Sequence, residues 1–246
     1  MIGICDSGVG GLIVYQKLTA LLPDARFVYL ADQAYAPYGE RSQEEITIRM
    51  RQVVQFLVDQ GATLVVIACN TATVNAIDEL RTQFPDTPIV GMEPAIKPAA
   101  LAATKILVLG TNSTVHNPRY RALVDQYAAQ HTVWNIGAPE LVRQVEAGDL
   151  SVSEAVAAKI QPYVDQGAEA VVIGCSHFSF LVPAIQAQWP SLQIFDGADG
   201  VARRAAMKAQ ELAVGIGGDQ NHFFTTGTAS VAHFLTPPIP FEYVPF

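Results

Sequence analysis

The sequence is poor in cysteine and in positive charge, and it contains no long hydrophobic run. Its 246 residues include 15 Lys and Arg against 23 Asp and Glu. The resulting formal net charge of −8 argues against a nucleic-acid partner. No apolar run approaches the roughly eighteen residues that a membrane span requires, so we also expect no membrane partner.

The three cysteines match neither a disulfide framework nor a zinc knuckle, and there is no C-x-x-C motif to indicate redox chemistry. The chain opens directly into Ile2-Gly3-Ile4-Cys5, without the charged and apolar segments of a secretory signal. A reducing cytoplasm is therefore the expected location, and no metal site is expected.

Motifs for common cofactors are missing as well. Asp6-Ser7-Gly8-Val9-Gly10-Gly11 lies between a predicted strand and a predicted helix, but the third glycine of a dinucleotide fingerprint would fall at Ile13. No P-loop lysine is present, and Lys97 has no phosphate cradle for pyridoxal phosphate. We therefore expect no cofactor. The glycine-rich turn itself fits two interpretations equally, a capped tight turn or a loop that binds a carboxylate.

One segment of the chain occurs twice. Residues 58–69 recur at 164–175 with nine of twelve positions identical, and each copy ends in a cysteine after a short apolar run. Asn70-Thr71 follows Cys69, and Ser176-His177 follows Cys175. Two copies of one unit can place two thiols on opposite sides of a cleft. Such an arrangement would allow a proton to leave one face of a carbon and another to arrive on the opposite face.

The pattern of apolar runs predicts an α/β fold with a parallel sheet in each half. We expect strands near residues 2–5, 26–31, 63–68, 88–91, 105–110, 131–136, 169–174 and 192–195. We expect helices near residues 10–22, 42–60, 72–83, 115–129, 139–147, 151–167, 179–188 and 197–213. The stretch 94–103 is interpreted as a connection between domains. The predicted domains are residues 1–96 plus 207–246 and residues 97–206, with the polar motifs at the carboxyl ends of the strands.

Three further features have both a structural and a functional interpretation. Cys5, inside a strand, is interpreted as a small buried hydrophobe. His177 lies two residues past Cys175, so on an extended chain it returns to the same side and could exchange a proton there. The turn before the helix capped by Ser42 either starts that helix or lends backbone N–H groups or the Tyr38 hydroxyl to the cleft.

These segments together resemble the glutamate racemases, which are cofactor-independent members of the aspartate/glutamate racemase superfamily. The matching segments are Asp6-Ser7-Gly8-Val9-Gly10-Gly11-Leu12, Pro37-Tyr38-Gly39-Glu40-Arg41-Ser42, Ala68-Cys69-Asn70-Thr71-Ala72, Met92-Glu93-Pro94-Ala95-Ile96-Lys97-Pro98-Ala99, Gly110-Thr111 with Thr114, and Gly174-Cys175-Ser176-His177. They occur in the family's order over nearly the whole chain, which makes the set specific.

The resemblance implies two similar flavodoxin-like α/β domains with mostly parallel sheets, related by internal pseudo-symmetry, with the active site in the cleft between them. It implies that Cys69, assisted by Asp6, and Cys175, assisted by His177, act as the two acid–base groups. Acidic residues that match Asp32 and Glu146 are also implicated in some members of the family. The residues implied to hold the substrate are Asp6, Ser7, Tyr38, Gly39, Asn70, Thr71, Thr111, Thr114, Ser176 and His177.

The implied reaction is the interconversion of L- and D-glutamate, which supplies D-glutamate for bacterial peptidoglycan. Cys175 would take the proton from L-glutamate and Cys69 from D-glutamate. The chain departs from the family where Ser176, Phe178, Ser179 and Phe180 stand for threonine, tyrosine, proline and leucine, and where Asn117 replaces a usual serine.

Two alternatives stay open at this stage. They are a racemase for aspartate or another small amino acid, and a catalytically inactive amino-acid-binding protein on the same scaffold. The aromatic residues near the C-terminus, at 241–246, fit either a homodimer interface or closure of the core.

Overall fold

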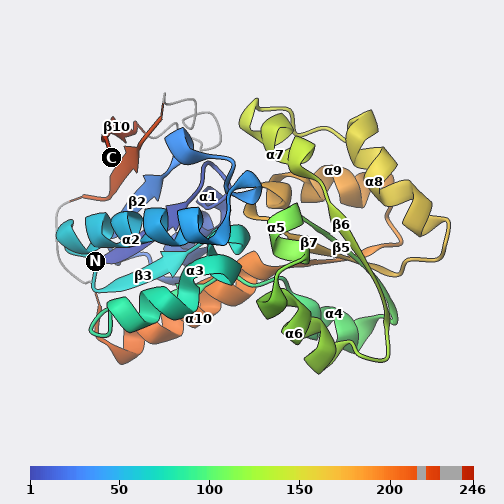
Figure 1. Ribbon diagram of the computed structural model, residues 1–246, viewed down its shortest axis with the longest axis horizontal. Coiled ribbons are helices and arrows are strands. Elements are labelled where there is room, and N and C mark those ends of the chain that lie inside the picture. Colours follow the sequence, from blue (N-terminus) through green and yellow to red (C-terminus); the bar gives the residue numbers. More distant parts are fainter. Residues whose placement is uncertain (215–219, 228–239) are drawn as a thin grey trace.

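The computed structural model describes residues 1–214, 220–227 and 240–246, and these form two parallel β-sheets that lie side by side (Figure 1). The first sheet has the strand order β10-β9-β2-β1-β3-β4 and the second has the order β6-β5-β7-β8. Every strand pair described in the two sheets is parallel. The predicted α/β fold with two mostly parallel sheets is confirmed.

The first half of the structure is formed by the N-terminal part of the chain, together with one helix and two strands from the C-terminal part of the chain. Its strands are β1 (Ile2–Asp6), β2 (Phe27–Ala31), β3 (Leu64–Ile67), β4 (Ile89–Gly91), β9 (His222–Thr225) and β10 (Glu242–Tyr243). Its helices are α1 (Leu12–Leu21), α2 (Gln43–Asp59), α3 (Asn70–Gln83) and α10 (Gly197–Glu211), with the 3-10 turns η1 (Gln33–Tyr35) and η2 (Tyr38–Glu40). Helix α10 packs against α1, β3 and β4.

The second half is continuous in sequence. Its strands are β5 (Lys105–Gly110), β6 (Thr132–Gly137), β7 (Ala170–Gly174) and β8 (Gln193–Asp196). Its helical segments are α4 (Ile96–Ala102), α5 (Asn112–Val115), α6 (Pro118–Tyr127), α7 (Pro139–Glu146), α8 (Glu154–Val164), η3 (Ser176–Leu181) and α9 (Val182–Gln188). The domain limits drawn from the sequence remain a prediction.

The internal repeat appears in the topology. The order β2-β1-β3-β4 in the first sheet corresponds to β6-β5-β7-β8 in the second, so β3 and β7 take equivalent central places. Both strands are buried along their whole length, because parallel sheets are covered by helices on both faces. Leu64 and Val66 of β3 pack into one hydrophobic cluster, while Val65 and Ile67 pack into another. The two repeated cysteines therefore follow equivalent strands.

Three details differ from the sequence prediction. The helix expected at 115–129 is two helices, α5 and α6, because Pro118 lacks the N–H that would continue α5 and instead starts α6 behind the cap Asn117. The helix expected at 179–188 begins as the 3-10 turn η3, and α9 starts at Val182. The stretch 94–103, interpreted as a connection, contains the short helix α4.

The aromatic C-terminal segment returns to the first sheet. Phe241 contacts the rings of Tyr29 and Phe223, with centroid distances of 6.0 and 5.5 Å, and Phe246 lies under the Arg49 guanidinium at 4.7 Å. Tyr243 stays 62% exposed. Core closure is thus visible for part of the segment, whereas a homodimer remains a prediction.

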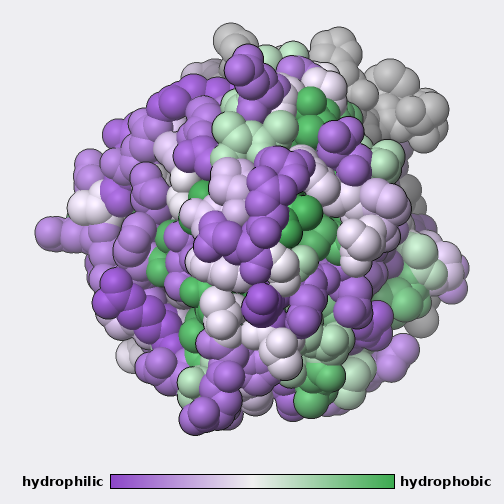
Figure 2. All heavy atoms as spheres, turned by 90° about the vertical axis from the view of Figure 1, so that its right-hand side faces the viewer, coloured by the Kyte–Doolittle hydropathy of each residue, from purple (hydrophilic) through white to green (hydrophobic). Residues whose placement is uncertain are grey.

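The outer face of the second half is mainly polar. Figure 2 shows hydrophilic side chains over most of this face, with hydrophobic ones in small separate patches. This agrees with the excess of acidic residues in the sequence. No helix in the ranges 1–214, 220–227 and 240–246 is long and apolar enough to cross a membrane.

Candidate active site

Cys69 lies where β3 meets α3, and it is the N-terminal cap of that helix. Its Sγ accepts a hydrogen bond from the Ala72 backbone N–H at 3.4 Å, and it donates to Ser7 Oγ at 3.8 Å. The side chain is buried. Burial and the negative charge of Asp6 raise the pKa of the Cys69 thiol well above its ordinary value. These surroundings therefore favour the neutral thiol of Cys69.

Cys175 follows β7 and is also buried, but its neighbour is a charged pair. His177 Nε2 lies 2.5 Å from Glu146 Oε1. Burial lowers the pKa of His177, but hydrogen bonds to Cys175 and Glu146 raise it by more, so the pKa stands well above its ordinary value. The surroundings of His177 accordingly favour its imidazolium form.

Glu146, at the end of α7, is the anion of this pair. Burial raises its pKa, but the hydrogen bond from His177, the charge of His177 and hydrogen bonds from Val9 N–H (3.0 Å) and Gln33 Nε2 (3.1 Å) lower it by more. The net pKa is below the ordinary value for a glutamate. Because Val9 and Gln33 belong to the first half, Glu146 joins the two halves at the site.

Asp6 connects the surroundings of the two thiols. Its Oδ1 accepts from the Gly8 backbone N–H at 2.9 Å, and its Oδ2 accepts from Ser176 Oγ at 2.8 Å. Burial raises its pKa, partly opposed by the charge of His177 and by the Ser176 hydrogen bond. The charge of Asp6 in turn raises the pKa of both Cys69 and His177. Asp6 thus influences both sides of the site.

The glycine-rich turn is pressed against the second half. A Cβ at Gly8 would overlap Glu146 Oε1 and lie 3.0 Å from His177 Nε2, and a Cβ at Gly10 would lie 2.8 Å from the His177 backbone nitrogen. Only glycine allows this approach. The capped turn is present, since Asp6 accepts the Gly8 N–H, and the binding of a substrate carboxylate by this loop stays a prediction.

Three buried threonines meet at the junction of the halves. Thr71 Oγ1 lies 2.9 Å from Thr111 Oγ1 and 3.2 Å from Thr114 Oγ1, and the last two hydroxyls are 3.0 Å apart. Gly39 approaches the same place, because a Cβ there would lie 2.8 Å from Thr111 Cβ. Asn70 donates through Nδ2 to Met92 O at 3.2 Å. Its buried Oδ1 has no hydrogen-bond partner among the described residues.

Tyr38 is buried, and its hydroxyl faces the carboxylate of Asp32. It donates to Asp32 Oδ2 at 2.6 Å. Asp32 also accepts from Arg49 Nε (2.8 Å) and Nη2 (2.6 Å) and from Thr226 Oγ1 (2.8 Å). Both versions of the Tyr38 prediction, the hydroxyl and the backbone N–H groups, stay predictions. Asp32 anchors the loop that carries Tyr38.

The structure thus brings Cys69, Cys175, Asp6, His177 and Glu146 to one place between the sheets. Sequence reasoning missed Gln33, which orients Glu146, and Arg49 and Thr226, which hold Asp32. No pattern in the sequence marks these three, since their contacts arise only from tertiary packing. Within the described part of the chain, no group of three or more His, Cys, Asp or Glu side chains is placed to hold a metal ion.

A match to a family model places this geometry in a known context. Residues 2–205 match the family described as Asp/Glu/Hydantoin racemase. The chain belongs to this racemase family. The resemblance seen in the sequence is confirmed.

Individual members of this racemase family are similar over most of their length. The chain is 42% identical over 209 residues to the glutamate racemase of Pseudomonas entomophila (strain L48), covering 82% of this chain and 79% of the relative. It is 37% identical over 247 residues to the glutamate racemase of Pseudomonas aeruginosa (strain PAO1), with 98% and 90% covered. The crystal structure of Escherichia coli glutamate racemase with L-glutamate and the activator UDP-MurNAc-Ala superposes with a TM-score of 0.85 and 32% identity, covering 96% of this chain and 92% of that one.

Proposed function

We propose that this protein interconverts L- and D-glutamate without a cofactor, using Cys69 and Cys175 as the two acid–base groups. The observation that carries the proposal is the pair of buried thiols at equivalent strand ends of the two sheets, close enough that a charge on Cys175 raises the pKa of Cys69. Glutamate is favoured as the substrate because relatives at 36–42% identity are glutamate racemases.

In each direction one thiolate removes the α-proton while the opposite thiol donates a proton to the other face of the carbon. For L-glutamate, Cys175 is the base, and the imidazolium of His177 beside it stabilises its thiolate. Cys69, held as a neutral thiol, then donates. For D-glutamate, Cys69 is the base and Asp6 assists it. The total charge is conserved, since one proton leaves and one arrives.

The Cα–H of an amino acid is a very weak acid, so the site must stabilise the developing carbanion with fixed donors. The buried hydroxyls of Thr71, Thr111 and Thr114 suit a carboxylate, and so do the backbone N–H groups of Tyr38 and Gly39. The buried and unpartnered Asn70 Oδ1 suits the substrate ammonium group. Ser7 and Ser176 complete the proposed set. Burial excludes water, which strengthens each of these contacts.

The deciding experiment incubates purified protein with L-glutamate in D2O without added cofactor. Circular dichroism follows the optical activity and NMR follows the α-deuterium. We expect loss of optical activity together with α-deuteration. Cys69→Ser and Cys175→Ser should each nearly abolish racemisation, and racemisation near the parent rate in both variants would refute the two-thiol mechanism.

The same assay separates the two alternatives. Exchange with aspartate but not with glutamate would indicate a racemase for a smaller amino acid. Glutamate binding without α-proton exchange would indicate a non-catalytic binding protein, the possibility raised by Phe178, Ser179 and Phe180. If glutamate is racemised, the biological role that we propose is the supply of D-glutamate for peptidoglycan in the cytoplasm.

A further inference from the structure

Helix α3 begins beside Cys69 and lies along the junction between the two halves (Figure 1). Three of its polar residues, Thr71, Asn75 and Asp78, contact the second half. Their spacing of four and three residues places them on one face of the helix, about one turn apart. This face is therefore a line of polar contacts that runs from the thiols outward.

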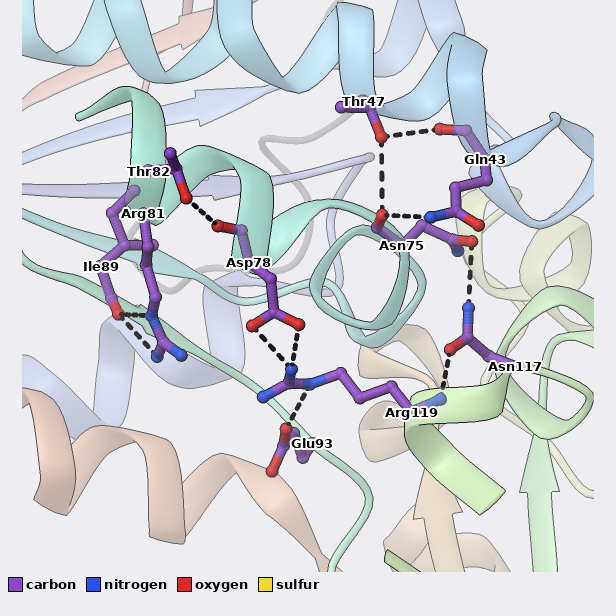
Figure 3. Close-up of polar contacts among 10 residues, drawn as sticks. All are labelled: Gln43, Thr47, Asn75, Asp78, Arg81, Thr82, Ile89, Glu93, Asn117 and Arg119. Atoms are coloured by element: carbon purple, nitrogen blue, oxygen red, sulfur yellow. Dashed lines mark hydrogen bonds and ion pairs between the residues drawn. The ribbon is translucent and has the colours of Figure 1, made fainter. Parts of the chain in front are cut away.

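Asn75 forms the middle contact of this line. Its Nδ2 donates to Ser113 Oγ at 2.9 Å and to Thr71 O at 2.8 Å, and its Oδ1 accepts from Asn117 Nδ2 at 3.1 Å. Its backbone carbonyl accepts from Gln43 at 3.3 Å, which ties α3 to α2 as well (Figure 3). Both ends of the Asn75 amide thus contact the second half, one turn away from the buried threonines.

Arg119, in the first turn of α6, forms the outer contact. Its Nη1 donates to both carboxylate oxygens of Asp78, at 2.8 and 2.7 Å, and its Nε donates to Glu93 Oε1 at 2.8 Å (Figure 3). Burial lowers the pKa of Arg119, but the two acidic partners raise it by more, so the guanidinium stays charged. One cation of the second half therefore joins two anions, on α3 and on the segment between β4 and α4.

Asn117 explains one departure of this chain from its family. Its Oδ1 accepts from the Arg119 backbone N–H at 2.8 Å and so caps α6, while its Nδ2 reaches Asn75. A serine, the usual residue, caps a helix equally well but has no amide to span the junction. Asparagine at this position adds a contact between the halves while keeping the cap.

We propose that Asn117 and Arg119 are positioning residues for the racemisation. Through Asn75 and Asp78 they fix α5 and α6 against α3. This keeps the second-half threonines at hydrogen-bonding distance from Thr71, next to the helix start at Cys69. The inference rests on the proposed function. Its physical reason is that a displacement of about 1 Å in a reacting geometry can cost up to roughly a hundredfold in rate.

The test compares Asn117→Ser, Asp78→Asn and their combination with the parent protein. Asn117→Ser keeps the helix cap and removes only the contact with Asn75, and Asp78→Asn keeps the side-chain shape and removes the charge. Glu79→Gln is the matched control, because Glu79 is the next residue of α3 and pairs with Arg51 on α2, within the same half. Exposed ion pairs contribute little to stability, so all variants should fold.

We expect the double variant to lose about tenfold in kcat/KM. Because the equilibrium constant of a racemisation is one, this loss must be the same in both directions. The larger share of it should appear as a raised KM, since the threonines are proposed binding groups. The control should stay within about twofold of the parent, and all thermal midpoints should lie within a few degrees of one another.

A second readout does not depend on glutamate. Maleimide labelling, followed by peptide mass spectrometry, reports the accessibility of each thiol. Cys69 and Cys175 lie between the halves, whereas Cys5 lies inside β1 and serves as an internal control. If the α3 contacts hold the halves in place, the double variant should label faster at Cys69 and Cys175 and unchanged at Cys5.

The outcomes separate this inference from the proposed function. A parent that racemises glutamate, with a double variant of unchanged kcat/KM and unchanged labelling, overturns the positioning role and leaves the function intact. A parent that does not racemise glutamate refutes the function. In that case, faster labelling confined to Cys69 and Cys175 in the double variant supports the positioning role of the α3 contacts, and unchanged labelling overturns that role. Faster labelling at Cys5 together with a lowered thermal midpoint would show general destabilisation and would also overturn it.

Discussion

The buried ion pair between Asp32 and Arg49 gives the clearest stability prediction. Asp32 is fully buried and Arg49 nearly so, with 10% of its side chain exposed, and two hydrogen bonds of 2.8 and 2.6 Å join them. Asp32→Asn keeps the shape of the side chain but leaves the Arg49 charge without its anion. Removing one partner of a buried ion pair costs about 3–5 kcal/mol of unfolding free energy.

For a chain of this length, each kcal/mol lowers the thermal midpoint by about 2–4 °C. Asp32→Asn should therefore lower the midpoint by roughly 6–20 °C in differential scanning calorimetry. Asp199→Asn is the control, because it breaks an exposed pair with Lys17 and should cost at most about 1 kcal/mol.

A double substitution checks the reasoning behind this magnitude. Asp32→Leu combined with Arg49→Met removes both charges, so no unpaired charge stays buried, and the double variant should be more stable than Asp32→Leu alone. Equal thermal midpoints for Asp32→Asn and the Asp199→Asn control would refute the claim that this pair is buried and strongly coupled.

Three further predictions concern the site. Tyr38→Phe should cost about 1 kcal/mol of unfolding free energy, because the hydroxyl donates to the buried carboxylate of Asp32. For the same reason the KM for glutamate should stay within about twofold of the parent value. A large rise in KM would instead indicate that the hydroxyl contacts the substrate. Gly8→Ala should lower kcat/KM about tenfold or more with an unchanged circular dichroism spectrum, whereas Gly200→Ala, where an added Cβ meets nothing within 4 Å, should not. The pKa of His177 is raised in the folded protein above its ordinary value. The stability that the protonated His177 contributes is therefore fully present below about pH 6.5, and it is lost as the pH rises through the raised pKa. Glu146→Gln should therefore move the imidazole titration to lower pH in NMR spectra, and an unchanged titration would contradict the ion pair.

The central part of the site could be predicted because it follows from local patterns. A buried parallel strand appears in the sequence as an unbroken apolar run, and residues just after such a run lie at the carboxyl edge of the sheet. The duplication placed Cys69 and Cys175 after equivalent strands, and the structure has them after β3 and β7. Pro118 also carried a local signal, since proline cannot continue a helix, but helical periodicity across it concealed the break between α5 and α6.

The surroundings of the site depend on contacts between distant parts of the chain. Gln33 meets Glu146 across 113 positions, and Thr226 meets Asp32 across 194. Glutamine and threonine are common surface residues, so nothing in their local sequence marks these two. Their roles require the docking of one half on the other and the return of β9 to the first sheet.

The unlike surroundings of the two thiols follow from the few positions at which the repeats diverge. After Cys69 the chain enters α3 directly, and the thiol becomes the helix cap beside the acidic Asp6, which disfavours its ionised form. After Cys175 the chain enters a 3-10 turn that brings His177 back beside the thiol, where its surroundings favour the imidazolium form. The divergence at Asn70-Thr71 and Ser176-His177 leaves Cys69 as a helix cap near Asp6 and Cys175 beside the His177–Glu146 pair, which is the arrangement that the proposed reaction needs in order to start from L-glutamate.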